Sequence, residues 1–260
     1  MRSQYGDVEV TQANHIATAE IKRGPNNFFD TELIRSLANA FEDIDKELDC
    51  RVIVLVAEGK HFCAGANFHS GQASRDLKDV PSGNPLYAEA VRLFSCRKPV
   101  VGGIQGAAIG GGFGLALVPD FRVLCAETRF AANFVKLGFH PGFGLTTTLP
   151  RLIGETRANL IFQTGRRIGG EEALAWGLGE IFTEKDNVRP AAEQLASEIA
   201  ENAPLAVQSV RATMRRGLAA AVKAATDHEF AEQARLQRTE DHKEGIKAVA
   251  ERRPGNFKGQ

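Results

Sequence analysis

A glycine-rich segment at residues 102–114 constrains this chain more than any other feature. It contains seven glycines among thirteen residues; Lys98–Val101, which resembles the start of a buried strand, precedes it, and the apolar run Leu115–Val118 follows. Glycine adopts positive φ angles at little cost and lets other groups approach its amide closely. Between a strand and a helix, such a segment predicts uncovered N–H groups at the helix N-terminus, where negative charge binds.

Other readings of this segment fit less well. A dinucleotide-binding G-x-G-x-x-G motif begun at Gly110 or Gly112 lacks its last glycine. A P-loop begun at Gly106 has the glycine spacing but lacks the following Lys and Ser or Thr. Residues 99–119 carry no charge and are long enough to span a bilayer. Each glycine, however, costs a helix about 1 kcal/mol relative to alanine, so we favour a strand, a turn and a buried helix.

Length, charge and cysteine content narrow the class of protein. The 260 residues fit one large domain, or one domain with an appendage, and Lys+Arg equals Asp+Glu at 32 each. This balance favours no nucleic-acid or membrane partner. Four separated cysteines without a C-x-x-C pair, and no apolar signal region, predict a cytoplasmic protein. The histidines show no metal-binding spacing, so we expect no metal.

Alternating patterns predict an α/β body with parallel strand pairing. Strands are expected at 8–10, 15–21, 52–56, 100–104 and 120–125. Helices are expected after Asp30, with apolar positions as far as Leu48, and at 84–94 and 112–118. From about residue 145 helical patterns dominate, at 149–162, 171–176, 190–201, 204–218 and 222–252. The last of these contain too few large apolar residues to form a core alone.

A second loop of small residues follows the strand predicted at 52–56. It reads Phe62-Cys63-Ala64-Gly65-Ala66-Asn67. Two such loops, each after a strand of an α/β body, could direct two backbone N–H groups at one oxygen atom.

Further short motifs follow along the chain, and the whole set has a familiar order. They are Lys98-Pro99-Val100-Val101, Gln105-Gly106, Gly110-Gly111-Gly112, Asp120-Phe121-Arg122, Leu137-Gly138, Pro141-Gly142, Leu149 to Gly154, Trp176-Gly177-Leu178 and Pro254 to Gly259. With these motifs over nearly its full length, the chain resembles the enoyl-CoA hydratase/isomerase (crotonase) superfamily.

The resemblance implies a crotonase-like spiral of ββα units at residues 1–195 and a helical C-terminal trimerisation region at 196–260. It implies a homotrimer or a dimer of trimers. It also implies an acyl-CoA thioester as substrate, with coenzyme A as part of that substrate and no separate cofactor. By motif position, the amides of Ala66 and Gly111 would form an oxyanion hole around the thioester carbonyl.

The carboxylates typical of this family are missing here. The positions of the two hydratase glutamates are Gly114 and Phe134, and the isomerase-type carboxylate position is Gly142. None of these three side chains can transfer a proton. The aspartate usual after Gly-Ala is replaced by Asn67.

His140 is the candidate replacement for these groups, because it lies on a loop that borders the active site in relatives and histidine titrates near neutral pH. The alternative is an inert ring packed between Phe139 and Phe143. Tyr87 lies on the helix that lines the acyl pocket in relatives, although core packing is the simpler role. His69 follows the first small-residue loop and could approach coenzyme A or the mouth of the acyl pocket.

Five residues are expected to contact coenzyme A by their places in the family pattern. Arg23 and Asn26 occupy an early coenzyme A-binding turn, and Ala64 would hold the adenine and pantetheine end. Phe257 and Lys258 match a C-terminal segment that reaches coenzyme A in relatives.

The sequence therefore predicts an acyl-CoA-processing enzyme, similar to an enoyl-CoA hydratase, with non-standard acid and base residues. A crotonase-type hydrolase, isomerase or C–C lyase remains open. A catalytically silent acyl-CoA-binding protein is the alternative outside enzymes.

Overall fold

The computed structural model describes residues 1–66 and 84–260, so the expectations for Asn67 and His69 lie outside the described residues. Seven strands form the larger sheet, in the order β1-β2-β3-β4-β5-β7-β10. β1 to β3 pair antiparallel, whereas all pairs from β3 to β10 are parallel. Their bounds are β1 (Gln4–Tyr5), β2 (Val8–Ala13), β3 (Ile16–Ile21), β4 (Val52–Ala57), β5 (Val100–Ile104), β7 (Phe121–Leu124) and β10 (Ile181–Phe182).

A second sheet, in the order β6-β8-β9, lies beside the first. It consists of β6 (Ala107–Ile109), β8 (Arg129–Ala131) and β9 (Arg167–Gly169). β6 falls inside the glycine-rich segment, which was expected to contain one strand, a turn and a helix. The segment instead holds the end of β5, then β6, then the helix, because β6 pairs with β8 over three residues.

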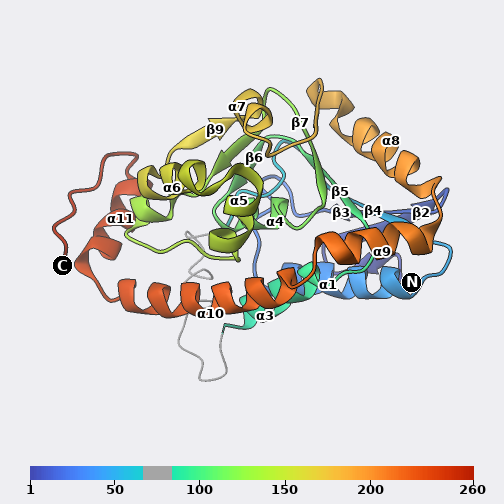
Figure 1. The fold of residues 1–260 in the computed structure, drawn as a ribbon. Coiled ribbons are helices and arrows are strands. Elements are labelled where there is room, and N and C mark those ends of the chain that lie inside the picture. The colour runs from blue at the N-terminus through green and yellow to red at the C-terminus, as the bar shows by residue number, and fades with distance from the viewer. Residues whose placement is uncertain (67–83) are drawn as a thin grey trace.

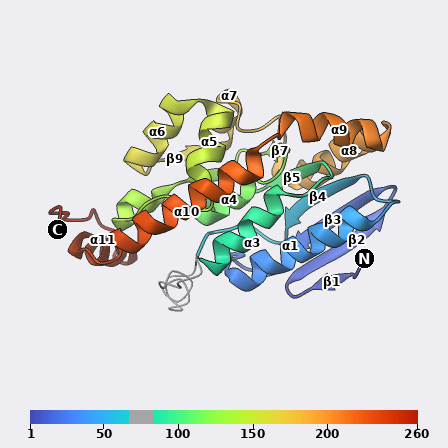
Figure 2. The same cartoon turned by 60° about the horizontal axis from the view of Figure 1, so that its bottom comes forward.

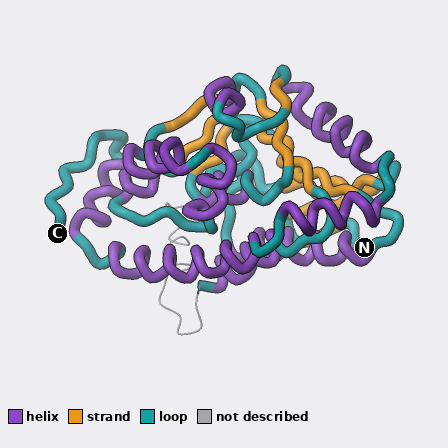
Figure 3. The backbone as a smooth tube through the Cα atoms, viewed as in Figure 1, coloured by secondary structure: helices purple, strands orange, loops and turns teal. Residues whose placement is uncertain are grey.

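Helices cover both faces of the larger sheet (Figures 1 and 3). They are α1 (Thr31–Lys46), α3 (Pro85–Phe94), α4 (Gly111–Ala116), α5 (Leu145–Ile153), α6 (Glu155–Thr164), α7 (Gly170–Ala175), α8 (Val188–Ala200), α9 (Pro204–Met214), α10 (Leu218–Leu236) and α11 (Glu240–Ala250), with short 3₁₀ helices η2 (Asn133–Leu137) and η3 (Lys185–Asn187). The predicted α/β body with a helical C-terminal part is confirmed.

The central strand β4 divides the core into two parts. All six of its residues are buried, as its unbroken apolar run predicted. Ile53 and Leu55 belong to the cluster under α1 and α3, whereas Val52, Val54 and Val56 belong to the cluster under α8. Successive strand residues point to opposite faces, so one strand contributes to both parts.

Local capping signals place the first helices correctly. The Asp30 side chain accepts the N–H of Leu33, and the Asn84 side chain accepts the N–H of Leu86. The expectation that Leu48 continues the apolar face of α1 is wrong: the helix ends at Lys46, and Leu48 is 97% exposed.

Two long helical patterns are each divided in the structure. The pattern at 149–162 is divided by Gly154, whose φ of +80° ends α5 before α6 begins. The pattern at 222–252 is divided between α10 and α11, where the Thr239 side chain caps the new helix through the N–H of His242. α10 packs beside α3, and α11 packs on η2 (Figure 2). This arrangement brings the C-terminal helices to the same region as the glycine-rich segment.

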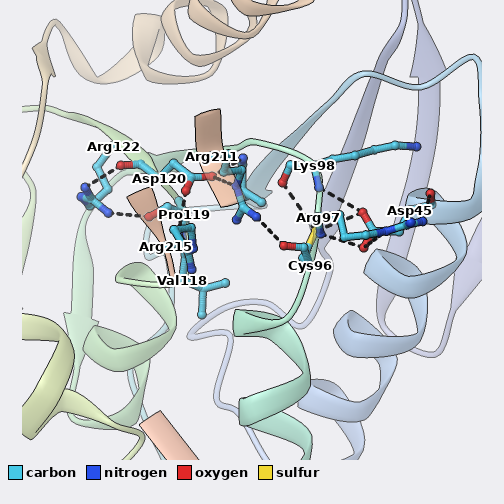
Figure 4. A network of polar contacts seen from close by, with 11 residues as sticks. Asp45, Cys96, Arg97, Lys98, Val118, Pro119, Asp120, Arg122, Arg211 and Arg215 are labelled. Carbon is cyan, nitrogen blue, oxygen red and sulfur yellow. Dashed lines mark hydrogen bonds and ion pairs between the residues drawn. The ribbon is translucent and has the colours of Figure 1, made fainter. Parts of the chain in front are cut away.

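Asp120, directly before β7, joins that strand to α9 (Figure 4). One carboxylate oxygen lies 2.7 Å from Arg211 Nε, and the other lies 2.7 Å from Arg215 Nη1. The backbone N–H of Val100 also donates to Asp120, at 2.8 Å. One nearly buried carboxylate therefore holds Arg211 of α9, and Arg215 directly after it, against the starts of β5 and β7.

In the described part of the chain, no helix is long and apolar enough to cross a membrane.

Candidate functional site

The two small-residue loops lie side by side and are joined by backbone hydrogen bonds. The Cys63 N–H donates to the Ala107 carbonyl, and the Ile109 N–H donates to the Cys63 carbonyl, both at 3.0 Å. His61 adds a tether, because its Nδ1 accepts the N–H of Ala107 at 3.2 Å. The structure therefore brings together the two segments whose amides were expected to share one oxygen.

Close packing explains why glycine occupies key positions of these loops. A Cβ at Gly111 would lie 2.2 Å from Phe29 Cζ, and a Cβ at Gly65 would lie 2.6 Å from the Ile109 carbonyl oxygen. Gly65 also has a φ of +85°. A larger residue at Gly65 would push the two loops apart, and one at Gly111 would displace the Phe29 ring.

Gly111 is the first residue of α4, so its N–H has no acceptor within the helix. The amides of Phe113 and Gly114 differ, since both donate to the Gly110 carbonyl. Within residues 1–66 and 84–260, no backbone acceptor is found for the N–H of Ala66 either. As far as the described residues extend, both amides can therefore donate to an external acceptor.

Ala66 and Gly111 line one cavity of about 260 Å³. Its wall is mainly apolar, and six aromatic residues from segments far apart in the sequence contribute to it: Phe28, Phe29, Tyr87, Phe134, Phe139 and Phe143. Ile246 and Val249 of α11 also contribute to it. Among the described lining residues, only Tyr87, Asn133 and Gln233 have polar side chains.

Packing accounts for the missing carboxylates. A Cβ at Gly114 would lie 2.7 Å from the Cβ of Phe143, and a Cβ at Gly142 would lie 2.0 Å from the Tyr87 hydroxyl oxygen. Phe134 itself forms part of the cavity wall. The space that acid or base side chains would need is therefore filled by aromatic rings.

The structure does not place His140 in the lining of this cavity. The ring is half-buried, its Nδ1 donates to the Pro141 carbonyl at 2.8 Å, and it meets His228 edge-on at 5.8 Å between ring centroids. The alternative prediction, a ring packed between Phe139 and Phe143, does not match these contacts, because Phe139 stacks on His242 and Phe143 packs on Phe29.

The expected coenzyme A turn packs against the first loop. The Asn26 carbonyl accepts the N–H of Ala64 at 3.0 Å, and Ala64 lines the cavity. Arg23 is already paired, with Asp7 at 2.6 Å and Asp30 at 2.8 Å. An incoming phosphate would therefore compete with two carboxylates for this guanidinium.

Phe257 and Lys258 lie on a C-terminal tail that folds onto α11. The Lys258 N–H donates to Asp241 at 2.7 Å, and the Asn256 N–H donates to Glu244 at 2.9 Å. Neither Phe257 nor Lys258 lines the cavity.

Two polar residues of α10 support the site and were not foreseen. Glu229, fully buried, accepts the N–H groups of Gly144 and Thr146 at the start of α5. Gln233, one turn later, is only 1% exposed. Both continue a stripe of buried residues at heptad spacing with Val222 and Thr226, and that spacing was the available signal.

No group of His, Cys, Asp and Glu residues in the described ranges could hold a metal ion.

Comparison with known proteins agrees with this geometry. The family described as enoyl-CoA hydratase/isomerase matches residues 11–260. The Bacillus subtilis protein YngF, which carries that family name, is 32% identical over 234 residues, 90% of each chain. The carnitinyl-CoA dehydratase of Salmonella enteritidis is 28% identical over 257 residues, 97% of this chain and 98% of that one.

A crystal structure of an enoyl-CoA hydratase/isomerase from Pseudoalteromonas atlantica has the same fold, with a TM-score of 0.84 at 24% identity over 97% of this chain and 100% of that one. The chain belongs to the enoyl-CoA hydratase/isomerase (crotonase) family.

Proposed function

We propose that this protein is an acyl-CoA-processing enzyme, in which the N–H groups of Ala66 and Gly111 stabilise the oxyanion of a thioester enolate or tetrahedral intermediate. The observation that carries the proposal is that these two residues, 45 positions apart, line one cavity beside hydrogen-bonded loops. Two preorganised donors suit such an oxygen, and losing one typically costs about 3 to 4 kcal/mol of transition-state stabilisation.

The wall of the cavity suits the acyl part of such a substrate. It is mainly apolar and aromatic, with few polar groups to fix orientation, as is common in small-molecule sites. Ala64 borders this cavity, and Arg23 and Asn26 lie on the turn packed against it, in support of a coenzyme A path along this edge. A role for Phe257 and Lys258 requires the tail to leave α11 or to reach the site of another subunit.

We propose His140 as the acid or base of this reaction. His140 is the histidine of the loop that contributes Phe139 and Gly142 to the cavity, but its own ring lies outside the lining. A catalytically silent acyl-CoA-binding protein is the second candidate. The observation that favours it is the wall itself, where the described side chains include no carboxylate and no imidazole.

We further propose that residues 196–260 mediate assembly into a trimer or a dimer of trimers. Three apolar side chains of α9 support this, since Leu205, Val210 and Met214 are 80%, 64% and 72% exposed. Sedimentation equilibrium of the purified protein would give its subunit number, and a monomer at all concentrations would refute the assembly proposal.

A panel of saturated and α,β-unsaturated CoA thioesters tests the activity, with hydration and free-thiol release followed separately. Turnover of any member supports an enzyme, and the product separates hydration from hydrolysis, isomerisation and C–C cleavage. Loss of turnover in His140→Ala, with acyl-CoA affinity retained, would support an acid/base role for that histidine. Binding without turnover across the panel would favour the silent acyl-CoA-binding protein.

A further inference from the structure

Tyr87 and Gln233 form a buried polar pair in the mainly apolar cavity wall. Tyr87 lies on α3 and Gln233 on α10, 146 residues apart, and both line the cavity. The Tyr87 hydroxyl lies 2.7 Å from Gln233 Oε1. Gln233 Nε2 lies 2.9 Å from the His140 carbonyl and 3.3 Å from the Pro141 carbonyl.

The direction of the hydrogen bonds follows from these partners. Backbone carbonyls can only accept, so the NH₂ group of Gln233 must face His140 and Pro141. The carboxamide oxygen therefore faces Tyr87, and the tyrosine must donate its only hydroxyl hydrogen to it. A phenol oxygen that donates its hydrogen keeps two lone pairs.

The phenol stays neutral in this position. Burial raises the pKa of Tyr87 well above its usual range, and the nearby Glu229 carboxylate acts in the same direction. The hydrogen bond with the backbone of Phe143 lowers the pKa but does not overcome this effect. If the Phe143 N–H takes one lone pair of the phenol oxygen, one more is left for a ligand.

The Tyr87 hydroxyl occupies the space that a side chain at residue 142 would need, since a Cβ at Gly142 would lie 2.0 Å from the hydroxyl oxygen. A neutral acceptor thus takes the place where the family pattern has a carboxylate.

We infer that the Tyr87 oxygen accepts a hydrogen bond from a hydroxyl group on the acyl chain, which makes Tyr87 a specificity-determining residue for hydroxyacyl thioesters. This inference rests on the proposed acyl-CoA function. Gln233 is its positioning residue, because it fixes the direction of the tyrosine hydrogen and leaves only accepting capacity toward the cavity.

Isothermal titration with butyryl-CoA, 2-hydroxybutyryl-CoA, 3-hydroxybutyryl-CoA and free coenzyme A tests the inference. A net hydrogen bond of ordinary strength corresponds to about fivefold in affinity. The wild type should therefore bind at least one hydroxyacyl thioester about fivefold more tightly than butyryl-CoA, and Tyr87→Phe should reduce this ratio to about one. Tyr5→Phe is the matched control and should keep the ratio, because the Tyr5 hydroxyl donates to Asp43 and does not line the cavity.

The ratio within each variant cancels general losses of affinity. An unchanged ratio in Tyr87→Phe would overturn the inference while leaving the proposed function intact. If Tyr87→Phe does not fold, a wild-type ratio near one overturns it by itself, and Gly142→Ala, which displaces the same hydroxyl, provides the second variant. Equal binding of all thioesters and free coenzyme A would contradict the proposed function as well.

Discussion

Gly114→Glu restores, in sequence, a glutamate typical of the hydratases, and the structure indicates that it should destabilise the protein. A Cβ at this position would lie 2.7, 2.8 and 2.9 Å from Phe143 Cβ, Cδ1 and Cγ. Phe143 has little freedom to move away, because it is 1% exposed, packs on Phe29 and has a φ of +63°.

The magnitude follows from three contributions. Overpacking a core costs about 1 to 3 kcal/mol, and burying an unpaired carboxylate costs several kcal/mol more, about 2 kcal/mol even if it is protonated. Replacing glycine in a helix returns less than about 1 kcal/mol. We expect a net loss of at least about 2 kcal/mol in the free energy of unfolding, which lowers the melting temperature by at least roughly 4 to 8 °C.

Calorimetry at one fixed protein concentration measures this change, since assembly makes the melting temperature depend on concentration. Gly169→Glu is the matched control: no atom lies within 4 Å of its added Cβ, and it precedes the N-terminus of α7. We expect a change below about 0.5 kcal/mol there. If Gly114→Glu has the same melting temperature as Gly169→Glu and also gains crotonyl-CoA hydration, the reasoning is refuted, because Phe143 then does not exclude the carboxylate.

Three further predictions concern other parts of the molecule. Asp120→Asn should lower the free energy of unfolding by about 3 kcal/mol in a denaturant titration, because two nearly buried arginines lose their charged partner. Asp227→Asn, which breaks the exposed pair with Lys223, is the control and should cost less than about 1 kcal/mol. The C-terminal tail should leave α11 in acid, because Arg253 lowers the pKa of Glu244 from 4.5 to about 2. The contribution of ionised Glu244 to holding the tail is therefore complete above pH 4.5 and is lost as the pH falls toward 2. Hydrogen exchange at the Asn256 amide measures this loss, and constant protection down to about pH 2 would contradict it. Asp30→Ala should tighten coenzyme A binding severalfold by freeing Arg23 from one of its two carboxylates, and unchanged affinity at low salt would argue against a phosphate contact at Arg23.

Elements with strong local signals could be predicted from the sequence. β4 is a short, unbroken run rich in β-branched residues, which favours a buried strand, and α1 and α3 follow the capping residues Asp30 and Asn84. The two loops of small residues were also found, because glycine and alanine beside strands have few other uses.

Features that depend on distant partners could not be predicted. β6, β8 and β9 have three residues each, too few to show a periodicity, and they exist because they pair with one another. The space beside Gly114 and Gly142 is filled by Phe143 and Tyr87, which only the fold brings there. For the same reason the pairing of Tyr87 with Gln233, 146 residues apart, could not be predicted, although the heptad spacing on α10 marks Gln233 as a buried position.

The direct test of the central claim is the vibrational frequency of a bound thioester carbonyl. Isotope-edited infrared difference spectroscopy with a ¹³C-labelled butyryl-CoA carbonyl reports whether hydrogen bonds polarise that C=O group. If the Ala66 and Gly111 amides grip the oxygen, the band of the bound thioester lies at lower frequency than that of the free one. A thioester that binds with an unshifted carbonyl band would contradict the oxyanion hole.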